Sequence, residues 1–192
     1  MNIESSEQLK DLVENATKLR SAILFFIQRF PGKLNRVMLC KYLFYADGHY
    51  YQKFQETITE FPYLHIEGSP QPLHFNELIH SMLGEGAIEV QPQITEEERD
   101  GKKFTVLRGM SFNATGQEKG TFSRRELKVL NSVASLLDGS LALETRYFPN
   151  LFQSYAQTNL YSQIKFHAFE SGVRPHLSWK AWANKIFRFR QQ

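Results

Sequence analysis

Residues 33–54 read KLNRVMLCKYLFYADGHYYQKF, and this stretch predicts the centre of the fold. Apolar side chains recur at helical spacing along two sides of it: Leu34, Val37, Met38, Tyr42 and Tyr45 on one, and Leu39, Leu43, Ala46 and Tyr50 on the other. A helix that is apolar around most of its circumference is one against which other elements pack. We therefore expect a central apolar helix over residues 33–54.

The start of this helix carries its own signals. Pro31-Gly32 ends a preceding helix. Asn35 is suited to the N-cap, where its side chain accepts a hydrogen bond from the free backbone N–H of Val37 or Met38. Leu34 and Leu39 flank it at the spacing of a hydrophobic staple.

Composition limits the class of protein. A chain of 192 residues fits one domain that buries its own core. The first residues, MNIESSEQLK, lack a signal-peptide pattern, and we find no apolar run near the ~20 residues of a membrane span. Cys40 has no second cysteine to pair with. These features predict a cytoplasmic setting and no membrane span.

The remaining elements are expected to be mostly helical. Helices are predicted over about 6–30, 73–83 and 123–137, the last from a capping box of Ser123 and Glu126, with a short helical turn at 141–147, a helical segment at 150–170 and a last helix from Ser178. Residues 57–66 favour a loop with a short strand. One β-hairpin is expected at about 87–108, with a polar loop of about ten residues ending in Asp100-Gly101, followed by a mobile loop at 110–121. The predicted fold class is α+β, mostly α: a compact helical domain around the helix at 33–54, with one hairpin.

No arrangement of residues predicts catalysis. The six histidines lack the spacing that places two imidazoles on one helical face, so neither a metal site nor a cofactor is expected. Cys40 lies inside the central helix, where a free cysteine usually packs as a small apolar side chain. We find no nucleophile elbow, Walker loop or dinucleotide-binding glycine pattern. The sequence predicts no catalytic residues and a protein that is not an enzyme.

Nucleic-acid binding is a less favoured alternative. Three helices followed by a hairpin imitate a winged helix, with phosphate contacts from Arg99, Lys102, Lys103 and Arg108 in the wing. The candidate recognition helix at 73–83 nevertheless contains Glu77 and neither lysine nor arginine, which disfavours DNA. The basic segment at 180–190 also has two interpretations, a solvated helix face or a contact with an anionic partner.

The central helix resembles the signature of the Panacea domain, also called the SocA-like antitoxin or phage-associated protein family. That signature is roughly L-x-K-L-L-Y-F-A-D-G-W-Y, and the matching residues are Leu39, Lys41, Leu43, Ala46, Asp47, Gly48 and Tyr50. Tyr42 replaces the usual leucine, and Phe44-Tyr45 reverses the usual aromatic order. Downstream, Tyr63, the turn GSPQP at 68–72, the segment FNELIHSMLGEGAIEV at 75–90 and the helix from Phe122-Ser123 are similar in order and spacing. The resemblance covers about residues 20–138.

The resemblance implies a single SocA-like domain over 1–192, with a divergent helical part from about 140. It also implies an antitoxin in a bacterial or phage toxin–antitoxin system, whose partner is a cognate toxin, with a protease as a further partner where the antitoxin acts as an adaptor. The predicted partner-binding residues are Lys41, Tyr45, Asp47, Tyr50 and Tyr63. An ordinary structural interpretation stays open for Lys41 and Asp47, which can be charges satisfied inside the fold.

Overall fold

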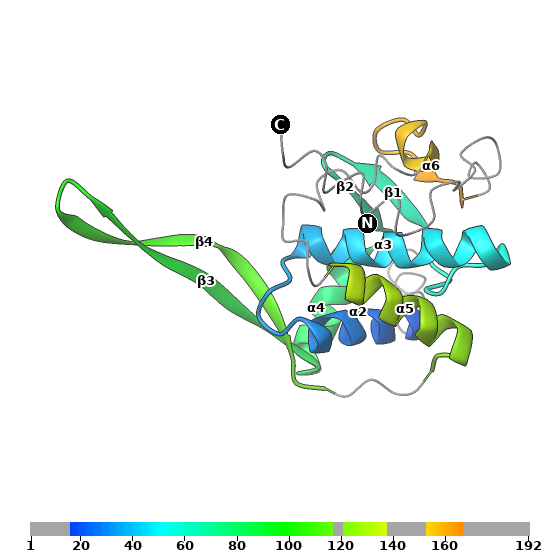
Figure 1. Cartoon of the computed structure of the whole chain (residues 1–192), viewed down its shortest axis with the longest axis horizontal. Coiled ribbons are helices and arrows are strands. Elements are labelled where there is room, and N and C mark those ends of the chain that lie inside the picture. Colours follow the sequence, from blue (N-terminus) through cyan, green and yellow to red (C-terminus); the bar gives the residue numbers. More distant parts are fainter. Residues whose placement is uncertain (1–15, 117–120, 138–152, 167–192) are drawn as a thin grey trace, which may run out of the picture.

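The structure is a computed structural model that describes residues 16–116, 121–137 and 153–166. Its helices are α2 (Thr17–Arg29), α3 (Arg36–Phe54), α4 (Phe75–Gly84), α5 (Arg124–Leu137) and α6 (Gln153–Ala156). Its strands are β1 (Tyr63–Ile66), β2 (Ser69–Pro72), β3 (Ile88–Arg99), β4 (Lys102–Ala114) and β5 (Gln163–Ile164). Figure 1 shows α3 across the middle of the body and the hairpin of β3 and β4 extending away from it.

The central helix is confirmed. Every residue from Leu39 to Gly48 is buried. The predicted cap is present, because the side chain of Asn35 accepts a hydrogen bond from the backbone N–H of Met38 at 2.9 Å. The helix ends at Gln55, a residue with left-handed backbone (φ 58°). Such an all-round apolar helix is covered by α2, α5 and strand β2 (Figure 1).

The prediction of a mostly helical fold with one hairpin is wrong. Of the described residues, 45% are helical and 27% are in strands, so the fold is a mixed α+β one. A second antiparallel sheet, of strand order β2-β1-β5, lies beside α3. Its edge strand β5 pairs Ile164 with Tyr63, inside a segment predicted to be helical. Local propensity cannot report such a pairing, because the two strands are far apart in the chain.

The hairpin is longer than predicted, and its loop is shorter. Residues 110–114, predicted to be a mobile loop, belong to β4, which pairs with β3 up to the turn at Asp100-Gly101. Both turn residues have positive φ, 54° and 71°, as a two-residue type I′ turn requires. The polar residues Thr95–Glu98 therefore lie in a strand, because this turn sets the register that pairs them across to β4.

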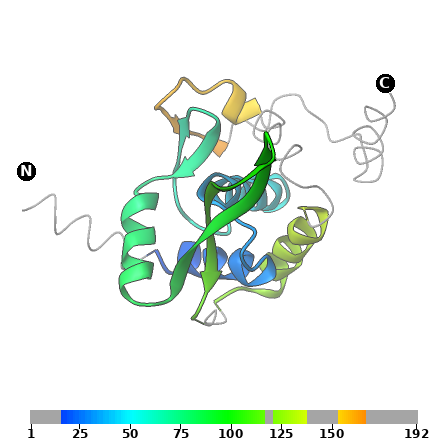
Figure 2. The same cartoon turned by 90° about the vertical axis from the view of Figure 1, so that its left-hand side faces the viewer.

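The base of the hairpin is anchored in the core, and the rest projects. Ile88 and Phe112 are buried. The backbone of Phe112 also pairs with the segment before α3, donating to the carbonyl of Leu34 at 3.0 Å and accepting from the N–H of Gly32 at 3.2 Å. Beyond this point, residues 91–110 form what we call the ribbon. Figure 2 shows it coming toward the viewer between α4 and α5.

The capping box of α5 is confirmed. The carboxylate of Glu126 accepts a hydrogen bond from the backbone N–H of Ser123 at 2.6 Å, and the Ser123 hydroxyl accepts one from the N–H of Glu126 at 3.3 Å. Lys18 of α2 completes the arrangement, because its ammonium lies 2.9 Å from Glu126 and 2.6 Å from Glu60. Burial would raise the pKa of Glu126, but the hydrogen bonds from Lys18 and Ser123 outweigh it and lower the pKa.

Lys18→Met should lower the free energy of unfolding by about 2 kcal/mol, because the buried carboxylate of Glu126 loses its cation while its cost of burial remains. Urea denaturation followed by circular dichroism measures this loss. Lys18→Arg keeps the charge and should cost less than about half as much. Glu60→Gln, at the exposed end of the same network, should change stability by at most about 0.5 kcal/mol. An equal loss in all three variants would contradict the proposed role of the buried pair.

The helix predicted at 73–83 is confirmed as α4, and the helix predicted at 123–137 as α5. The other terminal predictions lie outside the described residues. They are the beginning of the first helix before residue 16, the helical turn at 141–147, and the last helix from Ser178 with its basic segment at 180–190.

Candidate functional site

The carboxylate of Asp47 lies fully buried in the middle of α3 and accepts four hydrogen bonds. One oxygen accepts from the backbone N–H groups of Ile58 and Thr59, at 2.7 and 2.9 Å. The other accepts from the hydroxyl groups of Thr59 and Tyr63, the latter at 2.7 Å. All four donors belong to the segment between α3 and the first residue of β1. We call this arrangement the carboxylate tie, because it holds that segment against the central helix.

Burial raises the pKa of Asp47 from 3.8 to about 6, and the hydrogen bonds from Thr59, Tyr63 and Ile58 oppose that rise. The carboxylate is therefore ionised at neutral pH and accepts all four hydrogen bonds. Burial, and then the negative charge of Asp47, raise the pKa of the Tyr63 hydroxyl well above its usual value. The Tyr63 hydroxyl therefore stays protonated and donates a hydrogen bond to Asp47.

The tie predicts a specific pH dependence of stability. Because the pKa of Asp47 is higher in the native state than in the unfolded chain, its protonation favours the native state. Its contribution to the free energy of unfolding should therefore rise as the pH falls from about 7 to about 4, by up to about 3 kcal/mol. The quantity to measure is the unfolding free energy of the wild type minus that of Asp47→Asn, since the subtraction removes other titrating groups. A difference that stays flat, or falls on acidification, would contradict the prediction.

The five residues predicted to bind a partner are all buried: Lys41, Tyr45, Asp47, Tyr50 and Tyr63. The structure joins Asp47 to Tyr63 by a hydrogen bond. The ring of Tyr45 lies 5.9 Å from that of His49, and the ring of Tyr50 lies 4.6 Å from that of Phe54. Their contact with a partner stays a prediction. Because all five are buried, a partner could reach them only if the packing around them changed. What they form in the free protein is the interior of the body.

A second cluster, around Phe44, was not predicted from the sequence. The Phe44 ring lies 5.3 Å from Tyr63, 5.4 Å from Phe166 and 6.2 Å from Tyr155. It therefore joins the central helix to β1 and to the segment at 153–166. Two hydrogen bonds reinforce that junction: Tyr155 donates to the carbonyl of Ile66 at 3.2 Å, and the Nδ1 of His65 lies 2.6 Å from the carbonyl of Thr158. In the sequence, this position stands out only because Phe44-Tyr45 reverses the aromatic order of the family signature, and that reversal does not predict which residues Phe44 contacts.

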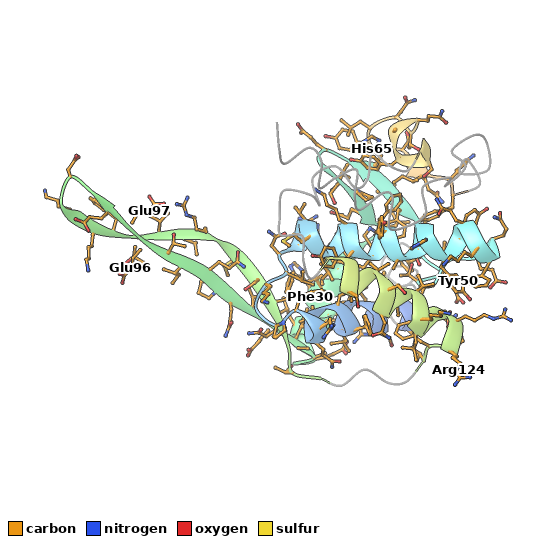
Figure 3. The ribbon with its side chains drawn as sticks, in the orientation of Figure 1. Phe30, Tyr50, His65, Glu96, Glu97 and Arg124 are labelled. Carbon is orange, nitrogen blue, oxygen red and sulfur yellow. The ribbon has the colours of Figure 1, made fainter. Side chains whose placement is uncertain are left out.

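The surface of the described residues distinguishes the ribbon from the body. The large apolar side chains that are exposed there are Val37, Ile94, Phe104, Leu107, Met110, Leu160 and Tyr161, and most of them belong to the ribbon. In the strand register, Ile94 pairs with Leu107, and Pro92 pairs with Met110. Cross-strand partners share one side of a sheet, and Pro92 and Ile94 lie on the same side because they are two residues apart in β3, with an irregularity of register between Gln93 and Ile94. These four side chains form what we call the apolar face. Figure 3 shows Glu96 and Glu97 farther out on the same ribbon, remote from Tyr50 and Arg124 on the body.

The described ranges contain neither a candidate metal site nor a helix that could span a membrane. No three side chains from histidine, cysteine, aspartate and glutamate come together there as a metal site. No helix in those ranges is both long and apolar enough to cross a lipid bilayer.

These features define a class of protein: a mixed α+β domain with a buried aromatic helix, a carboxylate tie and a projecting two-stranded ribbon. The comparison with protein families identifies the class more closely. The model of the antitoxin SocA-like, Panacea domain family matches residues 39–140, which is more than half of the chain, and the chain belongs to that family. Searches of curated proteins and of solved structures found no significant match.

Proposed function

We propose that this protein is an antitoxin-like module that neutralises or regulates a partner toxin by direct protein–protein interaction, in a bacterial or phage toxin–antitoxin system. The family match carries this proposal. The matched residues include most of the central helix, the carboxylate tie, the whole ribbon and α5. The proposal includes action in the cytoplasm as a single domain over residues 1–192.

The chemistry of the described residues is consistent with a binding role rather than an enzymatic one. Burial raises the pKa of the Cys40 thiol, so it stays protonated and is a poor nucleophile. The carboxylate of Asp47 is occupied by four protein donors and faces no solvent. Both groups support the fold.

Two features argue against DNA as the partner. The acidic residues of the ribbon offset its basic ones, since Glu97 contacts Arg108 and Glu98 pairs with Lys103, so the wing offers phosphates little excess positive charge. Helix α4 contains Glu77 and lacks lysine and arginine. We therefore do not propose the winged-helix alternative.

The five predicted binding residues enter the proposal as positioning residues. Because they are buried, they would influence a partner only through the surfaces that they hold in place. A substitution such as Tyr50→Phe should then leave binding intact wherever it leaves the fold intact. Substitution of a side chain that touches the partner would instead weaken binding without changing stability.

The experiment is co-expression with the protein encoded by the adjacent reading frame. Expression of that adjacent protein alone should arrest growth, and co-expression of this chain should restore it. The two proteins should also co-purify in a fixed ratio. A frameshifted copy of the gene is the control for an effect of the transcript. Persistent arrest, or purification with DNA and no stoichiometric protein, would overturn the proposal. The half-life of the toxin in cells with and without the protein then tests the adaptor role separately.

A further inference from the structure

The ribbon is preformed, and within the described ranges the body holds it near its base, where the side chain of Gln93 donates a hydrogen bond to the carbonyl of Gly32 at 3.4 Å; farther out it projects from the body (Figure 1). The turn at Asp100-Gly101 sets its register, and Arg108 contacts Glu97 and donates a hydrogen bond to the Thr95 hydroxyl at 3.1 Å. A two-stranded hairpin alone is only marginally stable in water, and three strands or a packed face are usually required. The ribbon therefore has much to gain from a partner that packs against it.

The apolar face is where such a partner would gain most. Ile94, Leu107 and Met110 are 55%, 62% and 48% exposed, and they lie with Pro92 on one side of the ribbon. Contiguous exposed apolar side chains of this size mark interaction surfaces more often than isolated ones do. Burying them against a partner removes apolar surface from water, which favours association.

Charge limits the kind of partner. On the same side as the apolar face, and one step nearer the tip, Glu96 is exposed and pairs across the ribbon with the uncharged Thr105. The next pair toward the tip, Glu98 with Lys103, is of opposite charge, and Glu97 on the other side contacts Arg108. Glu96 therefore stands beside the apolar face as an exposed carboxylate with no basic residue directly opposite, since the lysine on that side, Lys103, lies opposite Glu98. A complementary partner would place a lysine or arginine there.

The size of the apolar face argues against a second copy of this chain. Four side chains of this kind present on the order of a few hundred Å², whereas a stable interface buries about 800 Å² on each side. Two ribbons placed flat against each other would not reach that area, and their Glu96 side chains would add negative charge to negative charge. A groove would also cover the strand edges and Phe104 on the opposite side, which is itself 47% exposed.

We propose that the apolar face of the ribbon is the docking surface for the protein partner, and that the ribbon enters a groove that combines an apolar strip with a basic side chain facing Glu96. This inference rests on the proposed function, because it identifies how the partner toxin is held. The body supports the ribbon at Phe112, and the partner contacts lie between Pro92 and Met110.

The test uses the full chain and the protein encoded by the adjacent reading frame. The affinity of the double variant Ile94→Ser/Leu107→Ser should fall at least about tenfold, and that of Glu96→Lys should fall also, because the central apolar contacts of an interface carry most of its energy. Matched controls are Tyr161→Ser, which removes an exposed apolar side chain from the body, and Glu67→Lys, which makes the same charge reversal away from the ribbon. Both should bind like the wild type. Thermal unfolding of each variant separates weaker binding from weaker folding.

A photo-crosslinking residue identifies the occupant directly. A benzophenone side chain placed at 107 should form an adduct with the partner, while the same group at 161 should form none. A wild type that neither binds nor neutralises the partner overturns the proposed function and this inference with it. A wild type that binds, beside a folded double variant that binds equally well, overturns only the ribbon proposal. So does an adduct at 107 between two copies of this chain.

Discussion

Asp47→Ala is expected to lower the free energy of unfolding by about 4 kcal/mol, close to the limit for a single substitution. The change removes the acceptor of four hydrogen bonds and leaves buried the backbone N–H groups of Ile58 and Thr59 and the hydroxyl groups of Thr59 and Tyr63. A buried donor without an acceptor costs about 1–3 kcal/mol, and partial access of water reduces the sum. Urea denaturation followed by circular dichroism measures the loss.

Asp47→Asn is the matched control, and it should cost no more than about 1 kcal/mol. The amide oxygen can still accept from the two backbone N–H groups. Its NH₂ group can donate to the hydroxyl oxygens of Thr59 and Tyr63, since both hydroxyls can rotate and accept. Asp47→Asn also removes the cost of burying a charge. An Asn variant as unstable as the Ala variant would show that the negative charge matters more than the set of acceptors, and an Ala variant near wild-type stability would contradict the carboxylate tie.

Phe44→Ala should cost about 4 kcal/mol, because it removes a fully buried ring and leaves a cavity that a rigid neighbourhood cannot refill. The ring contacts Tyr63, Tyr155 and Phe166, so the loss should concentrate at the junction of β1 with residues 153–166. Amide hydrogen exchange should accelerate more at Ile164, in β5, than at Leu43, which lies beside Phe44 in α3. Urea denaturation gives the total loss.

Two control variants locate the effect. Phe44→Leu retains most of the volume and should cost less than half as much. Phe54→Ala removes a half-buried ring at the end of the same helix, where Arg125 lies 5.6 Å above it, and should cost about 1–2 kcal/mol without changing exchange at Ile164. Uniform acceleration of exchange after Phe44→Ala would show that the ring supports the whole core and not this junction.

Features that depend on neighbouring residues could be predicted from the sequence. The cap at Asn35 and the capping box of Ser123 and Glu126 follow from side chains that reach backbone groups three residues away. The turn at Asp100-Gly101 follows from residues that tolerate positive φ. The family followed from the string between Leu39 and Tyr50 and was confirmed by the family match.

Features that depend on residues distant in the chain could not be predicted from the sequence. Strand β5 forms because Ile164 pairs with Tyr63, and the secondary-structure propensities of residues 150–170 do not predict that pairing. The lysine that completes the pair at Glu126 lies 108 residues away along the chain. The hairpin loop was predicted about ten residues long because its residues are polar, but polar residues also suit a strand that meets solvent on both sides.

By itself, the sequence determined the buried central helix, its N-cap, the hairpin turn and the family, because each depends on periodicity or on contacts within a few residues. The tertiary structure decided the rest. It made Asp47 the acceptor of four hydrogen bonds from the segment before β1, and it built a second sheet from strands distant in the chain. It also made the ribbon project from the body with the side chains of its apolar face exposed, since packing between elements decides which apolar side chains are buried.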